Sequence, residues 1–186
     1  MAVYTKISKD DISIINNNFN IEKILSFHGI KKGIENTNYL LKSKNKKYIL
    51  TIFEKRVSER EIPFFMELMD ILNNFKISCP RPLKTNNKNY LIKLKKKSAC
   101  IVSFLEGKDK KFLKTSDCLA IGKSIARMHL ITKKIKLKRK NSMGINNLEP
   151  LLKGIKFKSK ETSNLKIFLK KNLKNIRKNW PKKLPK

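Results

Sequence analysis

Hydrophobic residues follow two different patterns along the chain. Some segments have short continuous apolar runs, which are typical of strands, and others have an apolar residue every three or four positions, which is typical of helices. Apolar runs bounded by polar turns predict strands over residues 22–31, 38–42 and 48–53. Helical spacing then follows, with one apolar face made of Ile62, Phe65, Met66, Met69 and Leu72. Two further apolar runs, 90–94 and 99–104, predict a return to strands. The pattern therefore predicts three strands, a helix and two more strands.

Helical patterns flank this strand-rich segment on both sides. Before it, Ser8 begins a capping-box variant at the start of a short amphipathic helix. After it, Ser116 is a candidate N-cap for a helix whose apolar face holds Leu119, Gly122, Ile125, Met128 and His129. The last helical pattern covers residues 164–179. We therefore expect an α+β fold, in which residues 1–107 form one lobe and residues 108–186 begin a helix-rich second lobe.

Composition adds a large positive charge to this picture without indicating a nucleic-acid-binding protein. The 186 residues carry 45 Lys and Arg against 14 Asp and Glu, a formal net charge of +31. Six of these cations are Arg, the residue that proteins favour for bidentate contacts with phosphate and guanine. A solvated lysine surface explains this composition better than a nucleic-acid footprint does. We therefore expect that nucleic acid is not a partner.

Cysteine usage and hydropathy indicate the compartment. Cys79, Cys100 and Cys118 are widely spaced and form no CxxC pair, which favours a reducing compartment over a disulfide framework or a zinc site. The first residues lack the long apolar core of a signal peptide. The longest apolar-rich run, residues 99–105, is too short to span a bilayer. We expect a cytoplasmic protein that does not contact a membrane.

The turn between the first two predicted strands carries the strongest chemical signal. Gly lets a backbone approach an anion closely, and polar residues at the tip of a turn offer further hydrogen bonds. On spacing alone, an ordinary β-turn explains the same residues equally well. The elements that follow, however, come in the order of a kinase N-terminal lobe, in which such a turn covers the phosphates of ATP. The candidate nucleotide-binding residues here are Gly33, Glu35, Asn36, Thr37 and Asn38.

The third strand of such a lobe normally presents a Lys to the phosphates, and this sequence has Thr51 at the inward position. The nearest cations are Lys55 and Arg56, of which Lys55 is the candidate phosphate partner. The acidic partner on the following helix would be Glu61 or Glu67, and spacing does not choose between them. A solvated lysine at a strand end and ordinary helix-surface glutamates are the simpler explanations of these residues.

The end of the last predicted strand lies where a kinase hinge would contact adenine through backbone groups. Val102 and Phe104 are therefore candidate nucleotide-binding residues, although core packing accounts for Phe104 equally well. We expect His129 to be a buried, hydrogen-bonded structural residue and His28 to be a strand residue. The sequence contains no Walker-type loop, no Ser-His-Asp arrangement and no cluster of metal ligands.

Eight segments in order resemble the homoserine kinases of the choline kinase and aminoglycoside phosphotransferase superfamily. They are Met1–Thr5, Leu25–Ile30, Gly33–Leu41, Tyr48–Arg56, Pro63–Phe65, Cys79–Pro80, Ile101–Gly107 and Ala126–Leu130. The resemblance continues to Trp180–Pro185, and Thr51 in place of the usual third-strand Lys or Arg is also normal for this family. It implies ATP-dependent phosphorylation of the L-homoserine hydroxyl, a step toward threonine, with Mg²⁺ bridging the phosphates of ATP.

The same resemblance shows where this sequence departs from the family. Its members continue into Gly-x-x-His-x-Asp-Leu-x-x-x-Asn and then an Ile-Asp-Phe segment, whose first Asp would position the hydroxyl and whose Asn and second Asp would hold magnesium. Neither segment occurs in this sequence, so the catalytic Asp and Asn are absent from it. We therefore expect residues 1–186 alone to lack kinase activity, and a separately encoded C-terminal half is a possible partner.

Two other classes of function stay open at this point. The first is a nucleotide-binding interaction protein that has lost catalysis, which would bind ATP without turning it over. The second is a basic nucleic-acid-binding protein, whose affinity would fall steeply with salt. The second lacks the arginine content and the basic strand with exposed aromatic residues that single-stranded nucleic acids require.

Overall fold

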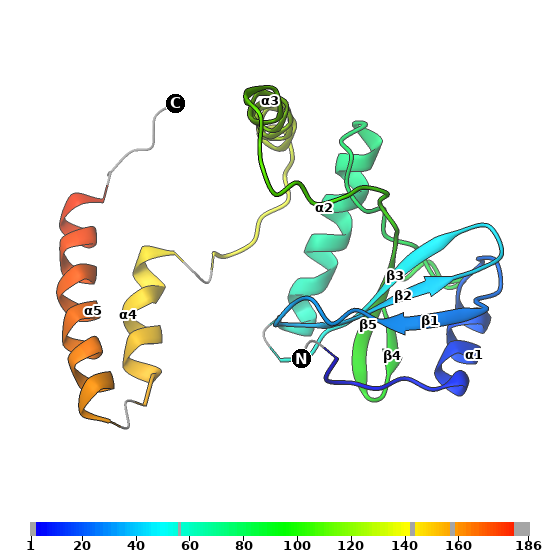
Figure 1. Ribbon diagram of the computed structural model, residues 1–186, viewed down its shortest axis with the longest axis horizontal. Helices are drawn as coiled ribbons and strands as arrows, with labels where there is room; N and C mark the ends of the chain where they lie inside the picture. The colour runs from blue at the N-terminus through cyan, green and yellow to red at the C-terminus, as the bar shows by residue number, and fades with distance from the viewer. Residues whose placement is uncertain (1–2, 56, 142–143, 157–158, 181–186) are drawn as a thin grey trace. The chain divides into compact units, whose positions relative to one another are not determined.

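The computed structural model describes residues 3–55, 57–141, 144–156 and 159–180, and its contacts divide the chain into two compact units, 1–138 and 139–186. The first unit contains a five-stranded antiparallel sheet in the order β1-β2-β3-β5-β4 (Figure 1). Its strands are β1 (Ser26–Gly29), β2 (Thr37–Lys42), β3 (Lys47–Ile52), β4 (Ile92–Leu94) and β5 (Lys97–Ser103). The predicted sheet is confirmed.

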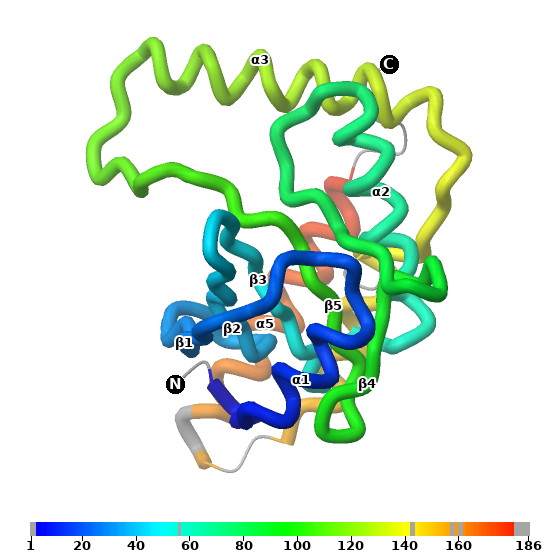
Figure 2. Tube along the Cα trace, turned by 90° about the vertical axis from the view of Figure 1, so that its right-hand side faces the viewer, coloured from blue at the N-terminus to red at the C-terminus, as the bar shows by residue number. Residues whose placement is uncertain are grey.

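Two helices cover opposite faces of this sheet because its strands alternate apolar side chains between both sides. Leu50 and Ile52 of β3 point to the core that contains α1 (Lys9–Asn18), and neighbouring Ile49 points to the core under α2 (Ile62–Asn74). In Figure 2, α1 lies in front of the sheet. A short 3₁₀ turn, η1 (Glu59–Glu61), leads into α2. The sheet therefore has one face for each helix.

The core on the α1 side contains more buried residues than the core on the α2 side. Leu41, Leu50 and Ile101 have no exposed surface on the α1 side, and burial of such side chains stabilises the fold by roughly 1.5–3 kcal/mol each. On the α2 side, Ile62 and Met66 pack against Val102. The α2 side is also the face on which the predicted kinase site would lie.

Several predicted boundaries were wrong. β1 and β4 are shorter than predicted, since residues 22–25 and 90–91 precede them. α3 (Thr115–Thr132) has Lys114 rather than Ser116 as its N-cap, because the carboxylate of Asp117 accepts the Lys114 N–H at 3.0 Å and closes the first turn there. Sequence reasoning missed α4 (Ile145–Gly154), which contains a proline, a residue that normally interrupts helices.

The side chains of α3 remain uncovered in the described part of the first unit. None of its residues is buried, and Leu119 is 59% exposed and Leu130 69% exposed. His129 is also exposed, so the expectation of a buried structural histidine was wrong, because none of the described residues covers that face closely enough to bury it. An Arg127 Nη2 hydrogen bond to the Phe75 carbonyl, 3.1 Å long, connects the helix to the end of α2. The lobe boundary after Gly107 stays a prediction.

The second unit is a pair of helices, α4 and α5 (Lys160–Asn179). Ser159 caps α5 through the Thr162 N–H, so this helix begins before the predicted residue 164. Glu149 of α4 pairs with Arg177 of α5 at 2.8 Å, and Leu152 is buried between the helices. None of the helices that the structure describes has a stretch long and apolar enough to cross a bilayer.

Candidate functional site

The turn between β1 and β2 projects from one end of the sheet. The Ile30 N–H donates to the Asn38 carbonyl at 2.8 Å, which closes the base of the turn, and residues 31–35 are exposed. Gly33 has a φ of +126°, a conformation that other residues adopt only with strain. The structure therefore explains why residue 33 is a glycine, since the backbone adopts this conformation where the chain reverses direction.

Below the turn, Asn38 and Thr51 form a polar pair on the α2 side of the sheet. They lie opposite each other in the register of β2 and β3, and the Thr51 hydroxyl donates to Asn38 Oδ1 at 2.8 Å. Both side chains are half-buried. Cys100 is the partner of Thr51 on β5, and Ile49 and Val102 continue the same face as an apolar surface. The structure thus brings these two predicted residues together.

The segment that would serve as the hinge lies at the opposite end of the sheet from the turn. Val102 is buried and pairs with Ile49 near the start of β3. The Phe104 N–H donates to the Lys47 carbonyl at 3.3 Å, and Lys47 Nζ lies 5.2 Å from the centre of the Phe104 ring. β3 spans six residues, or about 20 Å. The hinge segment and the turn are therefore separated by about the length of this strand.

Thr37 lies on the other face of the sheet from Asn38. Its side chain is completely buried and its hydroxyl accepts the N–H groups of Tyr4 and Thr5 at 3.0 and 3.1 Å. The hydroxyl also donates to Glu54 Oε1 at 2.6 Å. Because these partners occupy the Thr37 side chain, a contact between Thr37 and a nucleotide would have to involve its backbone.

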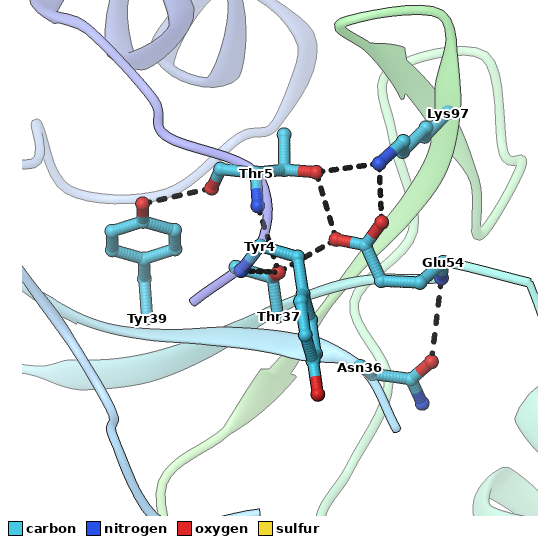
Figure 3. Close-up of polar contacts among 7 residues, drawn as sticks. All are labelled: Tyr4, Thr5, Asn36, Thr37, Tyr39, Glu54 and Lys97. Atoms are coloured by element: carbon cyan, nitrogen blue, oxygen red, sulfur yellow. Dashed lines mark hydrogen bonds and ion pairs between the residues drawn. The ribbon is translucent and has the colours of Figure 1, made fainter. Parts of the chain in front are cut away.

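Sequence reasoning missed Glu54, which connects three parts of the first unit (Figure 3). Its Oε1 accepts from the hydroxyls of Thr5 and Thr37, and its Oε2 pairs with Lys97 Nζ. Burial raises the pKa of the Glu54 carboxyl, but the hydrogen bonds from Lys97, Thr37 and Thr5 outweigh it, so its pKa lies below the ordinary value. The one available signal in the sequence was a carboxylate directly after an apolar strand.

Lys55 and Glu35 lie together at an open hollow of about 610 Å³ beside the turn, lined also by Tyr4, Ile34, Glu54 and Lys97. Lys55 is exposed there. Glu61 is half-buried at the residue that precedes α2, whereas the alternative, Glu67, is exposed on that helix. Arg56 lies outside the described residues. The structure therefore brings Glu35 and Lys55 together beside the turn.

The described residues were predicted from the sequence to hold no cluster of metal ligands. They contain no group of three or more His, Cys, Asp or Glu side chains that could hold a metal ion.

Solved structures that superpose on this chain include two phosphotransferases that act on small molecules. An amicoumacin kinase in complex with AMP-PNP and Ca²⁺ superposes with a TM-score of 0.68 at 15% identity, covering 97% of this chain and 55% of that one. A spectinomycin phosphotransferase in complex with ADP and spectinomycin gives 0.56 at 14% identity, covering 94% of this chain and 56% of that one. Likenesses at such low identity show the fold, which is the sheet and helices of a kinase-like N-terminal lobe followed by further helices.

Curated relatives match the chain over its whole length. A homoserine kinase of Paramagnetospirillum magneticum is 36% identical over 186 residues, and one of Methylocella silvestris is 34% identical. The chain spans 57% and 58% of the length of these two relatives. The predicted resemblance is thereby confirmed.

The family assignment comes from a third comparison. The phosphotransferase enzyme family matches residues 26–186, which include the turn, the Asn38–Thr51 pair, the hinge segment and both helices of the second unit. Since this match covers most of the sequence, the chain belongs to the phosphotransferase enzyme family.

Proposed function

We propose that this chain is the nucleotide-binding portion of a homoserine kinase, which transfers the γ-phosphoryl group of ATP to the hydroxyl of L-homoserine in threonine biosynthesis. The observation that carries the proposal is the match of the entire chain, at 36% and 34% identity, to homoserine kinases of two bacteria. The kinase-like lobe supports it, because an enzyme of this class needs a surface that holds ATP.

The geometry suggests a division of roles along the sheet. We assign the adenine to the hinge end, beside buried Val102, where the N–H of Phe104 is already donated to the Lys47 carbonyl and the backbone that follows Phe104 would contact the base. The phosphates would lie toward the other end, under the turn that contains Gly33 and beside the Asn38–Thr51 pair. Exposed turn backbone can donate to phosphate oxygens, and Lys55 adds a cation nearby. The role of Glu61 would be to orient such a cation from the start of α2.

Catalysis would require groups that this sequence does not contain, namely the Asp that positions the hydroxyl and the ligands for Mg²⁺. The residues described here would bind and orient ATP. Removing a single catalytic group of this kind usually costs orders of magnitude in rate. A polypeptide of residues 1–186 should therefore bind ATP and show no homoserine-dependent release of ADP. The cytoplasmic location also stays a prediction.

A chimera tests the proposed function. Residues 1–186 would be fused to the part of the Paramagnetospirillum magneticum homoserine kinase that does not align with them. We expect ADP release that depends on L-homoserine and is absent with L-serine, measured with a coupled assay. The relative's part alone is the negative control. A folded chimera that binds ATP without phosphorylating homoserine would contradict the proposed substrate and favour a nucleotide-binding protein without catalysis.

A pair of glycine variants tests the position of the phosphates without any need for turnover. Gly33→Ala places a side chain at a φ of +126°, a strain of about 1–3 kcal/mol that displaces the turn and should weaken ATP binding about tenfold or more. Gly122→Ala in α3 is the matched control, because nothing lies within 4 Å of the added carbon. Calorimetric titration with ATP would measure both. Equal affinities of the two variants would contradict the assignment of the phosphates to the turn.

A further inference from the structure

The N-terminal segment before α1 is attached to the β1–β2 turn by several hydrogen bonds. The Tyr4 and Thr5 N–H groups both donate to the Thr37 hydroxyl oxygen, and the Tyr4 hydroxyl donates to the Ile34 carbonyl at 3.1 Å. The Glu54 N–H donates to Asn36 Oδ1 at 3.4 Å. The returning side of the turn is therefore held by groups from outside it, as Figure 3 shows for Asn36 and Thr37.

Glu54 is the centre of this arrangement. Its side chain is 10% exposed, and its two carboxylate oxygens receive the hydroxyls of Thr5 and Thr37 and the ammonium group of Lys97. Lys97 Nζ also donates to Thr5 Oγ1 at 2.8 Å, so the three partners of Glu54 are connected to one another. Hydrogen bonds to a charged group are shorter and roughly twice as strong as neutral ones. The network thus links the N-terminal segment, the end of β3 and the start of β5.

The chemistry of this site requires a carboxylate. A glutamine at this position would offer one oxygen and one NH₂ group, and the NH₂ group would face either the Lys97 ammonium or the threonine hydroxyls. A hydroxyl can rotate to accept a hydrogen bond, but an ammonium group cannot accept one. The NH₂ group would therefore face the threonine hydroxyls, where the Thr37 oxygen already accepts two N–H groups. Replacing Glu54 by Gln thus removes the charge that pairs with Lys97 and puts a donor where the threonines now donate, with almost no change in side-chain volume.

We propose that Glu54 is a positioning residue that, with Lys97 and Thr5, holds the β1–β2 turn over the phosphates of a bound nucleotide. This inference rests on the proposed function, in which that turn covers the phosphates. When the network is lost, the turn spends less time in the binding position, and the dissociation constant rises in proportion to the lost population. The adenine end of the sheet is not part of the network, so binding of a nucleoside without phosphates should not change.

The test compares ligands with and without phosphates in Glu54→Gln. AMP-PNP, a non-hydrolysable analogue of ATP, is expected to bind about tenfold more weakly than to the unaltered chain if the turn is held one-tenth of the time. The dissociation constant of adenosine is expected to stay within about twofold of its value for the unaltered chain, because the turn does not form part of the proposed adenine site. Lys97→Met should weaken AMP-PNP binding in the same selective manner, and Lys97→Arg should restore most of it.

Glu22→Gln is the matched control. Glu22 also holds a turn through its carboxylate, since its Oε2 accepts from the Ser43 hydroxyl at 2.9 Å and from the Asn45 N–H at 3.0 Å. This turn joins β2 to β3 at the opposite end of the sheet from Gly33. Glu22→Gln should therefore leave the ratio of AMP-PNP to adenosine affinity unchanged.

The possible outcomes separate this inference from the proposed function. If the unaltered chain binds neither ligand, the proposed nucleotide site is wrong. If the unaltered chain binds both ligands and Glu54→Gln binds AMP-PNP equally well, the positioning role is wrong and the nucleotide site stands. A parallel loss of both affinities in Glu54→Gln would mean a general effect on the fold, which also overturns the positioning role.

Amide hydrogen exchange tests the positioning role without nucleotide. In Glu54→Gln, the amides of Thr5 and Ile30, which donate to Thr37 and Asn38, should exchange faster than in the unaltered chain. In Glu22→Gln, faster exchange should instead affect Asn45. Unchanged exchange at Thr5 and Ile30 in Glu54→Gln would overturn the proposal even if the chain binds no nucleotide.

Discussion

At the scale of single residues, burial decides which side chains are available to react. Cys100 is 2% exposed between β5 and α2, and burial raises its pKa to about 12, whereas Cys118 is exposed on α3. The thiolate is the reactive form of cysteine. At about pH 8, near the ordinary pKa of a thiol, iodoacetamide should label Cys118 and leave Cys100 unlabelled, as mass spectrometry of the peptides would show.

Two controls accompany this labelling experiment. Cys118→Ser should remove most of the labelling of the native chain, and concentrated guanidinium chloride should make Cys100 react. Rapid labelling of Cys100 in the native chain would contradict the packing of α2 on the sheet, because the thiol must leave the core to ionise.

At the scale of an element, α1 depends on its first turn. The Ser8 hydroxyl accepts the Asp11 N–H, and Asp11 Oδ2 accepts the Ser8 N–H at 2.8 Å, so the two residues cap the helix reciprocally. Ser8→Ala should lower the free energy of unfolding by about 1 kcal/mol, as measured by urea denaturation. Ser13→Ala, an exposed position in the same helix, should change it by less than about 0.5 kcal/mol. Equal effects of the two variants would contradict the capping role of Ser8.

At the scale of the whole molecule, the net charge of +31 should destabilise the folded chain by self-repulsion. Added NaCl should therefore raise Tm, with most of the gain below about 0.15 M, where the Debye length falls to about 8 Å. A gain of about 1 kcal/mol corresponds to a rise of about 2–4 °C for a chain of this size. Circular dichroism across a salt series would measure it.

The shape of this salt dependence identifies its cause. Screening saturates as the Debye length becomes shorter than the spacing of the charges, whereas exclusion of salt from the surface keeps increasing at high concentration. A fall of Tm over the first additions of salt would mean that the exposed ion pairs outweigh the repulsion, which their small individual energies do not lead us to expect.

The strands and the turn were predictable because their signals are local. Apolar runs of five to ten residues and the glycine at position 33 need only neighbouring residues to be interpreted. Helix starts were less predictable, since Lys114 and Ser159 became N-caps through side chains three residues further along the chain. α4 was missed because Pro150 lies within it.

The candidate site was predictable in part, for a similar reason. Asn38 and Thr51 were identified from the order of the strands, and the register of β2 and β3 makes them partners. Glu54 was missed because its importance depends on Thr5, Thr37 and Lys97, which lie 17 to 49 residues away in the chain. Thr37 stays a predicted nucleotide-binding residue, and only the tertiary structure shows that Tyr4, Thr5 and Glu54 occupy its hydroxyl.

The sequence by itself determined the α+β class, the five strands and the family, because these follow from local periodicity and from motifs in a set order. The tertiary structure alone decided which face of the sheet each polar residue occupies, that Glu54 connects the N-terminal segment to the turn, and that the side chains of α3 stay exposed. The physical reason is that burial and hydrogen bonding join residues that are distant in the chain, so the environment of a side chain depends on packing.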